Sequence, residues 1–172
     1  MKVRQAKLED AKGIATVHVD SWRSTYQGIV AQSYLDSLSY SAREELWHTA
    51  IPYGHVFVAE NEQGKIVGFV TASKERSGNY PDYQGELTAI YILAEYQGQG
   101  IGKALMQHTV RYLQMQGFES MLVLVLEDNP ATAFYKAIGG EKIDVVEIEI
   151  GGERLQEAVY GWRTLPQNGD LE

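Results

Sequence analysis

The sequence predicts an α+β fold in which helices flank a mixed, mostly antiparallel sheet. Three observations lead to this fold class. Segments 55–60 and 65–73 are apolar, β-branched runs joined by the turn NEQG, which is typical of an antiparallel hairpin. Segment 85–126 follows the pattern strand, helix, strand, so its two strands are expected to run parallel. Segments 142–150 and 153–165 form a closing hairpin around Gly151-Gly152.

The elements before the first hairpin are a short strand and three helices. Residues 3–6 are the strand, and apolar residues recur at helical spacing from Glu9 to about Trp22. Two further helices are expected at 31–38 and 41–50. Ser41 is the predicted N-cap of the last one, because Glu44 follows it at the spacing of a capping box. Residues 74–84 form a polar loop.

The second half of the chain alternates strands and helices. A strand at 85–93 is followed by a helix from about Gly100 to Met115, which ends at Gly117. The apolar run 120–126 indicates a buried strand covered on both faces. Asn129-Pro130 starts a helix that continues to Ala137. We expect one domain over residues 1–172.

The composition excludes several classes of function. A net charge of −8 argues against a non-specific binder of nucleic acid or of an anionic membrane. The absence of cysteine excludes disulfides, thiolate nucleophiles and cysteine zinc sites, and no metal is expected. The N-terminus lacks an apolar signal core, and no apolar run is long enough to span a membrane. A cytoplasmic protein is therefore expected.

The stretch EYQGQGIGKA, residues 95–104, carries the strongest functional signal. A dinucleotide fingerprint does not fit, because the third glycine comes one residue early. A Walker loop fails as well, since Gln97 and Ala104 stand where a glycine and a Ser or Thr are needed. Two alternatives stay open. Either the loop amides bind a diphosphate without metal, or the stretch is a glycine-rich helix start with no ligand.

Three segments resemble one known family. The strand LTAIYIL, the run from Gln97 to Gly102 that follows it, and the later segment NPATAFYKAIGG are similar, in this order, to core segments of the GNAT superfamily of N-acetyltransferases. The resemblance implies acetyl-CoA as cosubstrate and two central parallel strands that splay apart. It also implies that the pantetheine arm pairs with the strand and that loop amides hold the pyrophosphate. The residues implied are Ile90, Tyr91 and Ile92 for pantetheine, and Gln97, Gly98, Gln99, Gly100, Ile101, Gly102 and Lys103 for the loop.

Asn129 departs from the family pattern. It lies six residues before Tyr135, whereas the family asparagine lies seven residues before, at the place of Asp128. Asn129 is therefore either a pantetheine contact or the N-cap of a helix with proline at its first position.

Acetyl transfer to an amine needs a neutral amine, a donor to the oxyanion and a proton for the leaving thiolate. By resemblance to the histone-acetylating branch of the family, Glu86 is the expected base, acting through water. The alternative is that Glu86 holds the charge of the acceptor. Tyr135 falls where the family places its proton donor.

The acceptor pocket is expected in the variable N-terminal region. Trp22 and Tyr26, with Asp20, suit a cationic group, although Trp22 also fits a core position. Tyr80, Asp82 and Tyr83 are weaker candidates. The sequence thus predicts an N-acetyltransferase that acts on a primary amine of a small molecule or peptide, by direct attack in a ternary complex. The alternative is a non-catalytic acyl-CoA-binding sensor of the same fold. A homodimer is a further expectation.

Overall fold

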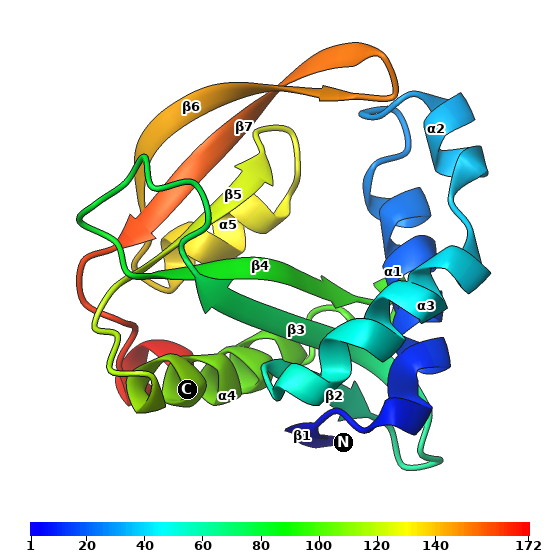
Figure 1. Cartoon of the computed structure of the whole chain (residues 1–172), viewed down its shortest axis with the longest axis horizontal. Helices are drawn as coiled ribbons and strands as arrows, with labels where there is room; N and C mark the ends of the chain where they lie inside the picture. Colours follow the sequence, from blue (N-terminus) through cyan, green and yellow to red (C-terminus); the bar gives the residue numbers. More distant parts are fainter.

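A seven-stranded sheet organises the chain, and the computed structural model describes all residues, 1–172 (Figure 1). The strand order is β1-β2-β3-β4-β5-β7-β6. Only β4 and β5 run parallel, and every other neighbouring pair is antiparallel, which confirms the predicted mixed sheet. The strands are β1 (Lys2–Gln5), β2 (Val56–Glu60), β3 (Ile66–Lys74), β4 (Gly85–Ile92), β5 (Met121–Leu126), β6 (Glu141–Ile150) and β7 (Glu153–Trp162).

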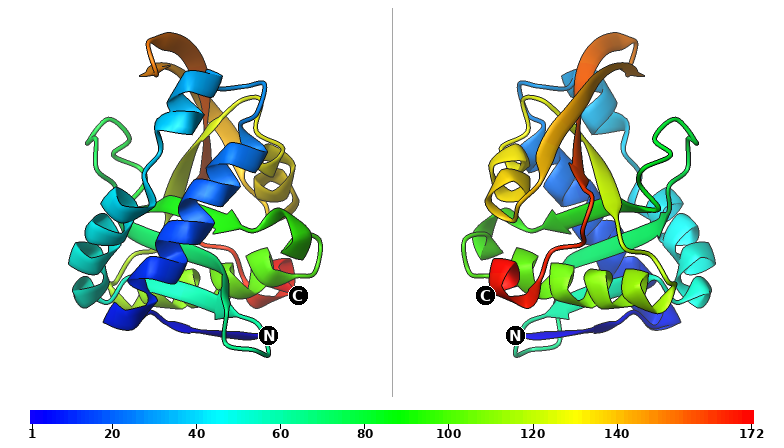
Figure 2. Two further views of the ribbon diagram at one scale, coloured as in Figure 1. Left: turned by 90° about the vertical axis from the view of Figure 1, so that its right-hand side faces the viewer. Right: turned by 90° about the vertical axis from the view of Figure 1, so that its left-hand side faces the viewer.

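Five helices lie around this sheet (Figure 2). They are α1 (Ala11–Thr25), α2 (Gln32–Ser37), α3 (Tyr40–Ala50), α4 (Ile101–Met115) and α5 (Ala131–Ala137). Helix α1 packs on β3 and β4, and α3 packs against α1. Helix α4 packs on β2, β3 and β4 from the opposite side. We refer to these two sides of the sheet as the α1 face and the α4 face.

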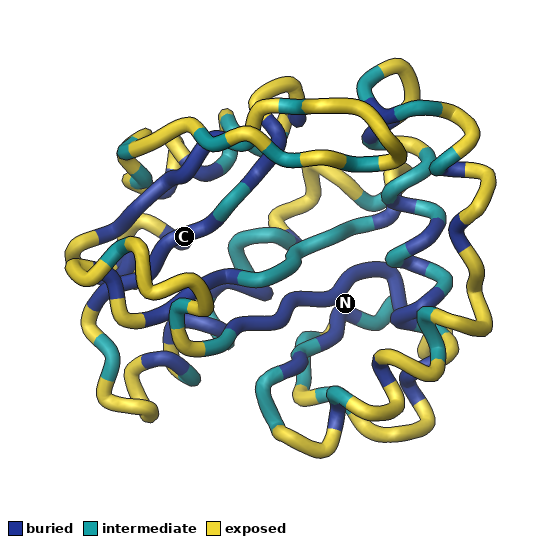
Figure 3. Tube along the Cα trace, turned by 45° about the horizontal axis from the view of Figure 1, so that its top comes forward, coloured by how far each residue is buried: buried dark blue, intermediate teal, exposed yellow.

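Alternation along the strands sends neighbouring side chains to opposite faces. The ring of Tyr91 stacks on His18 of α1, whereas Ile92 lies with Leu105 of α4 around Gly68. On β5 nearly every residue is buried, as expected for a strand covered on both sides. In Figure 3 strands β3 and β5 are mostly buried, β4 becomes half-buried beyond Leu87, and β6 has only exposed and half-buried residues.

The predicted N-cap of α3 is wrong by two residues. The side chain of Ser39, rather than Ser41, accepts a hydrogen bond from the Ala42 N–H at 3.2 Å, so α3 begins at Tyr40. Both serines offer the same chemistry, and the Ser41-to-Glu44 spacing favoured the wrong one. Helix α1 also extends further than predicted, to Thr25, and α4 begins at Ile101.

Strands β4 and β5 separate soon after they meet. Their pairing joins Gly85–Leu87 with Met121–Val123 and then stops. Just beyond, the register between β3 and β4 shifts at a bulge, where Thr88 is the extra residue and its hydroxyl donates to the Thr71 carbonyl. The two strands consequently diverge toward their C-terminal ends (Figure 1). The predicted splay of the central parallel strands is thus present.

The hairpin β6–β7 reaches across to the N-terminal helices. Gly151 and Gly152 form its tight turn with φ of +59° and +81°. A β-carbon on Gly151 would lie 2.8 Å from Tyr34 of α2, so the tip packs closely against that ring. At the other end, the Tyr80 hydroxyl donates to Asp144 of β6 at 2.8 Å. The hairpin and the 75–84 loop are therefore fixed to each other.

Candidate active site

A cleft of about 940 Å³ opens where β4 and β5 diverge. One end is lined by the turn between β4 and α4 and by Phe134 of α5. The other is lined by Arg76, Glu86 and Glu157, together with aromatic and aliphatic side chains. We call these the turn end and the charged end. A concave, largely apolar cleft with a few polar groups is the usual form of a small-molecule site.

The turn end presents backbone amides without partners. The first hydrogen bond of α4 runs from Ala104 N–H to Gly100 C=O, at 3.2 Å, and no hydrogen bond within the protein engages the N–H groups of residues 98–103. Gly98 and Gly100 adopt φ of +74° and +82°, a left-handed conformation that favours glycine. Such amides at a helix N-terminus fit a diphosphate.

Side chains of the turn have more local roles. The Gln97 amide donates to the Ile92 carbonyl at 3.1 Å and pins the turn to the end of β4. Gln99 does not line the cleft, and its amide is directed to the Glu95 carbonyl. A β-carbon on Gly102 would lie 3.4 Å from Phe134, so this glycine allows α5 to approach. Lys103 lines the cleft, and its ammonium donates to the Glu172 carbonyl at 2.6 Å.

Beyond Leu87, β4 has one edge free. Ile90, Tyr91 and Ile92 pair with β3 on one side and have no strand partner on the other. All three line the cleft. The free edge has the geometry to accept an extended chain as an added strand.

Asn129 sits in the loop between β5 and α5 and is 6% exposed. Its Nδ2 donates to the Tyr26 hydroxyl at 3.0 Å, and its Oδ1 accepts from the Ala131 N–H at 2.9 Å. Pro130 occupies the N-cap position, so α5 begins at Ala131, one residue later than an Asn129 cap would give. Asn129, just before the cap, thus binds the N–H of Ala131 and links the start of α5 to Tyr26 at the end of α1.

Tyr135 lies at the base of the cleft and is 4% exposed. Its ring packs against Tyr160 and Trp162 of β7, with centroids 6.2 Å away in both cases. Its hydroxyl makes no hydrogen bond within the protein. Burial, and secondarily the neighbouring Tyr26, raises the pKa of Tyr135 above its ordinary value, so the phenol stays protonated at neutral pH.

Glu86 is almost fully buried, with 3% of its surface exposed. Because Gly85 packs against Leu113 of α4, Glu86 points to the α1 face. Arg76 donates from its backbone N–H to Oε1 at 3.1 Å, and from Nε and Nη2 to Oε2 at 3.1 and 2.5 Å. Both carboxylate oxygens are therefore already engaged by the 75–84 loop.

Two charged groups of this end were not found from the sequence. Arg76 lies in a polar loop whose sequence has no pattern that predicts a functional role for this residue. Glu157 lies on β7 opposite Leu126, in the row of alternate residues that contains Leu155 and Val159. A charged residue in this otherwise apolar row is the sequence feature that could have marked Glu157 as a candidate site residue. Burial raises the pKa of Glu157, the negative charge of Glu86 raises it further, and Arg76 opposes both effects.

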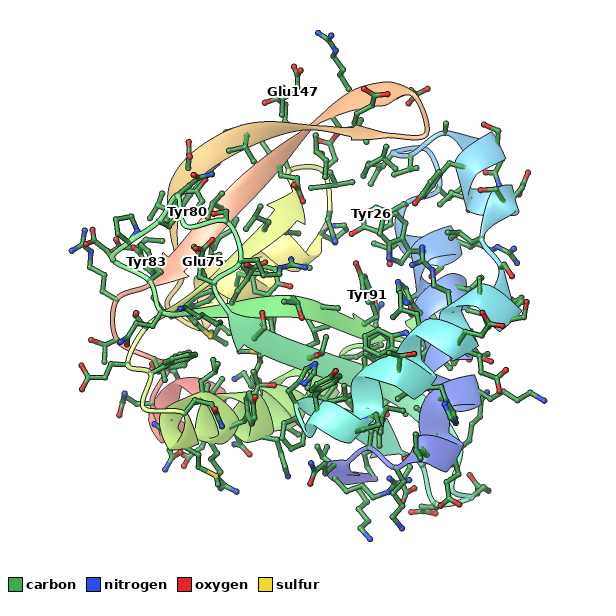
Figure 4. The ribbon with its side chains drawn as sticks, viewed as in Figure 1. Tyr26, Glu75, Tyr80, Tyr83, Tyr91 and Glu147 are labelled. Atoms are coloured by element: carbon green, nitrogen blue, oxygen red, sulfur yellow. The ribbon has the colours of Figure 1, made fainter.

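Two of the aromatic candidates for acceptor binding, Trp22 and Tyr26, lie in the cleft. Trp22 and Tyr26 line the cleft, with ring centroids 4.5 Å apart, and Tyr91 lies next to them (Figure 4). Burial raises the pKa of Tyr26. The Trp22 indole N–H is buried and has no hydrogen-bond partner.

Four weaker expectations fall outside the cleft. Asp20 accepts a hydrogen bond from the Tyr40 hydroxyl of α3. It lies two residues before Trp22 on α1, and residues at that spacing face different sides of a helix. Tyr83 packs on Gly161, and Tyr80 binds Asp144. Asp82 lies 3.6 Å from the Arg163 guanidinium. In Figure 4 Tyr80 and Tyr83 lie well away from Tyr26 and Tyr91.

No group of three or more His, Asp or Glu side chains is arranged to hold a metal ion. None of the helices combines the length and the apolar character that crossing a membrane requires.

Comparison with known proteins agrees with this geometry. Residues 17–139 match the model of the Acetyltransferase (GNAT) family. The chain is 47% identical to "Uncharacterized N-acetyltransferase YuaI" of Bacillus subtilis, over 95% of this chain and 93% of that protein. It is 23% identical to a spermidine N(1)-acetyltransferase of Thermoplasma acidophilum, over 93% and 98% of the two chains.

A solved structure shares the fold and contains the expected cosubstrate. It is a GNAT superfamily phosphinothricin acetyltransferase from Sinorhizobium meliloti in complex with AcCoA, with a TM-score of 0.72 and 25% identity over 98% of this chain and 94% of that one. The mixed sheet, the turn with its free amides and the family match lead to one conclusion. The chain belongs to the GNAT family and is an acetyl-CoA-dependent N-acetyltransferase.

Proposed function

We propose that this enzyme acetylates an aliphatic primary amine that binds as a cation, by direct attack on acetyl-CoA in a ternary complex. The observation that carries this proposal is the charged end of the cleft. Two carboxylates, Glu86 and Glu157, face one guanidinium, Arg76, so the end carries an excess of negative charge when both are ionised. An ammonium group suits such a site.

The surrounding side chains suit the rest of a flexible alkylamine. Ile148 and Ile150 of β6 line the same end as Trp22 and Tyr26 and offer apolar surface to methylene groups. The aromatic rings also favour a cation beside them. Two relatives support this acceptor class, namely the spermidine N(1)-acetyltransferase and an Escherichia coli peptidyl-lysine N-acetyltransferase, YiaC, which is 28% identical over 58% of this chain. A cytoplasmic location and a homodimer stay predictions.

In the proposed reaction the cosubstrate lies along the free edge of β4. Its pyrophosphate binds the amides of residues 98–103, and its pantetheine arm runs beside Ile90, Tyr91 and Ile92. The neutral amine attacks the thioester carbonyl, the C–N bond forms and the C–S bond breaks. Tyr135 gives its hydroxyl proton to the departing thiolate and takes the proton that the new amide nitrogen loses. Asn129 positions Tyr26 at the acceptor side.

The test is an acceptor screen that measures release of free CoA thiol. The enzyme contains no cysteine, so every thiol detected in the assay comes from CoA. Spermidine, putrescine, a lysine-containing peptide and a neutral aryl amine are compared at equal concentration. We expect the aliphatic amines to give the highest kcat/KM. Transfer to the aryl amine alone would contradict the proposed cationic acceptor.

A further inference from the structure

The charged end contains two carboxylates that differ in how many hydrogen bonds they accept. Glu86 accepts three hydrogen bonds from Arg76, out of the roughly four lone-pair positions that an ionised carboxylate offers. Glu157 lines the same cleft, and its carboxylate accepts no hydrogen bond within the protein. The two side chains are close enough for the charge of Glu86 to act on Glu157. The carboxylate with free lone pairs is therefore Glu157.

Glu157 is held in the cleft by its position in the sheet. It lies directly opposite Leu126 of β5 and Val146 of β6, so it faces no partner of opposite charge on either neighbouring strand. Val159, two residues on, packs with Tyr83 and Leu122 on the α1 face, which places Glu157 on that face as well. Glu86 points to the same face.

The groups that face Glu157 come from several elements. Besides burial, the charges that act on Glu157 are those of Glu86 of β4, which raises its pKa, and Arg76 of the 75–84 loop, which lowers it. Glu157 in turn adds to burial in raising the pKa of Tyr26 after α1 and of Tyr80 in the 75–84 loop, so both hydroxyls lie within reach of its charge. None of these groups donates a hydrogen bond to it. Together with the apolar Leu126 and Val146, this setting favours a carboxylate that takes up a proton more readily than an exposed one.

We propose that Glu157 is the general base that takes the proton from the acceptor ammonium, and that the Arg76–Glu86 ion pair is the positioning element beside it. This inference rests on the proposed amine acceptor. One proton passes from the ammonium to the Glu157 carboxylate and then to solvent, and the amine left behind is neutral and able to attack. The rest of the transfer proceeds as described above.

A raised proton affinity suits this task. A base works best when its pKa approaches the operating pH, and an ordinary glutamate is a weak base for an ammonium near pKa 10.4. Burial and the charge of Glu86 move the pKa of Glu157 in the favourable direction. Glu86 thereby assists the base even though its own oxygens are occupied.

The experiment compares pH profiles of kcat/KM in Glu157→Gln and Glu86→Gln, with spermidine or the lysine peptide as acceptor, whichever the screen favours. We expect the wild-type profile to have a plateau at neutral pH. In Glu157→Gln, kcat/KM should fall about 100-fold at pH 7, and this deficit should shrink as the pH rises toward the pKa of the amine. Glu86→Gln should keep the plateau, and its acidic limb should move to lower pH because a neighbouring negative charge is removed.

Glu147→Gln is the matched control. Glu147 is exposed on β6 of the same hairpin and points away from the cleft (Figure 4), so its profile should equal the wild-type one. CoA affinity by calorimetry checks that each variant is folded. The reverse pattern, in which Glu86→Gln loses the plateau and Glu157→Gln only shifts a limb, would assign the base to Glu86 and overturn the inference.

A second readout needs no turnover. Carbon-13 NMR of the glutamate carboxyls should show that the pKa of Glu157 lies above the ordinary glutamate value of about 4.3 and falls in Glu86→Gln. A Glu157 signal that titrates at the ordinary glutamate value and does not respond to Glu86→Gln would also overturn the inference. If the screen finds no amine acceptor while Glu157 titrates as expected, the proposed function fails on its own.

Discussion

At the turn end of the cleft, the proposed binding groups come from a single stretch, Gln97 to Lys103. At the charged end the groups come from a loop, from β4 and from β7, which are far apart in the sequence. The first end is built from backbone amides, so its sequence signal is the glycine spacing that the backbone needs. The second is built from side chains that only the folded sheet brings together. A contiguous site can be recognised from sequence, whereas a dispersed one requires the structure.

The first comparison of the two ends uses Tyr135, which lines the cleft. Tyr135→Phe keeps the packing against Tyr160 and Trp162 but removes the proton donor. We expect kcat to fall about 100-fold, the typical contribution of a general acid, with CoA affinity unchanged. Tyr53→Phe, at a tyrosine that is 76% exposed, is the control. Turnover equal to the parent would assign Tyr135 a purely structural role.

Gly100→Val tests the turn end through the backbone. Gly100 has φ of +82°, and a branched side chain there strains the turn and blocks the approach of the pyrophosphate. CoA binding should weaken at least tenfold, or about 1.4 kcal/mol, in calorimetry. Gly117→Val is matched to it, because Gly117 has φ of +81° at the other end of the same helix. If both variants lose CoA affinity equally, backbone strain alone explains the effect.

Tyr26→Phe tests the side-chain network of the charged end and should give the smallest change. It removes the hydrogen bond from Asn129 and leaves the ring against Trp22. Such a bond contributes about 1 kcal/mol, so KM for the amine should rise about fivefold while CoA affinity stays the same. Tyr34→Phe, in the same aromatic cluster, should leave KM unchanged. A fall in CoA affinity with an unchanged KM for the amine would indicate that Tyr26 contributes to CoA binding rather than to acceptor binding.

Most of the fold could be predicted from the sequence. The order of strands and helices, the parallel pair and the closing hairpin all follow from hydrophobic periodicity and glycine positions. Boundaries were less certain, since Ser39 and Ser41 compete for one cap and Pro130 starts α5 later than expected. These choices depend on backbone geometry that residue type alone does not specify.

The site could be predicted only in part. The glycine spacing predicted the turn before α4. It did not show that Gly102 packs against Phe134, which only the folded chain brings next to it. Glu86 was identified by its place in the strand, and its engagement with Arg76 depends on how the 75–84 loop folds back. Glu157 was missed although it interrupts an apolar row, because an isolated charge on a hairpin is most often solvated.

The ten-residue strand β6 forms one free edge of the sheet. An unpaired edge of this length is a template for aggregation, since a second chain can add to it by main-chain hydrogen bonds. Asp144, Glu147 and Glu149 are exposed along it. Two such edges brought together at neutral pH would place like charges side by side, and the repulsion opposes edge-to-edge growth. The acidity of this strand thus favours solubility over self-association, and a dimer formed through β6 would have to overcome it.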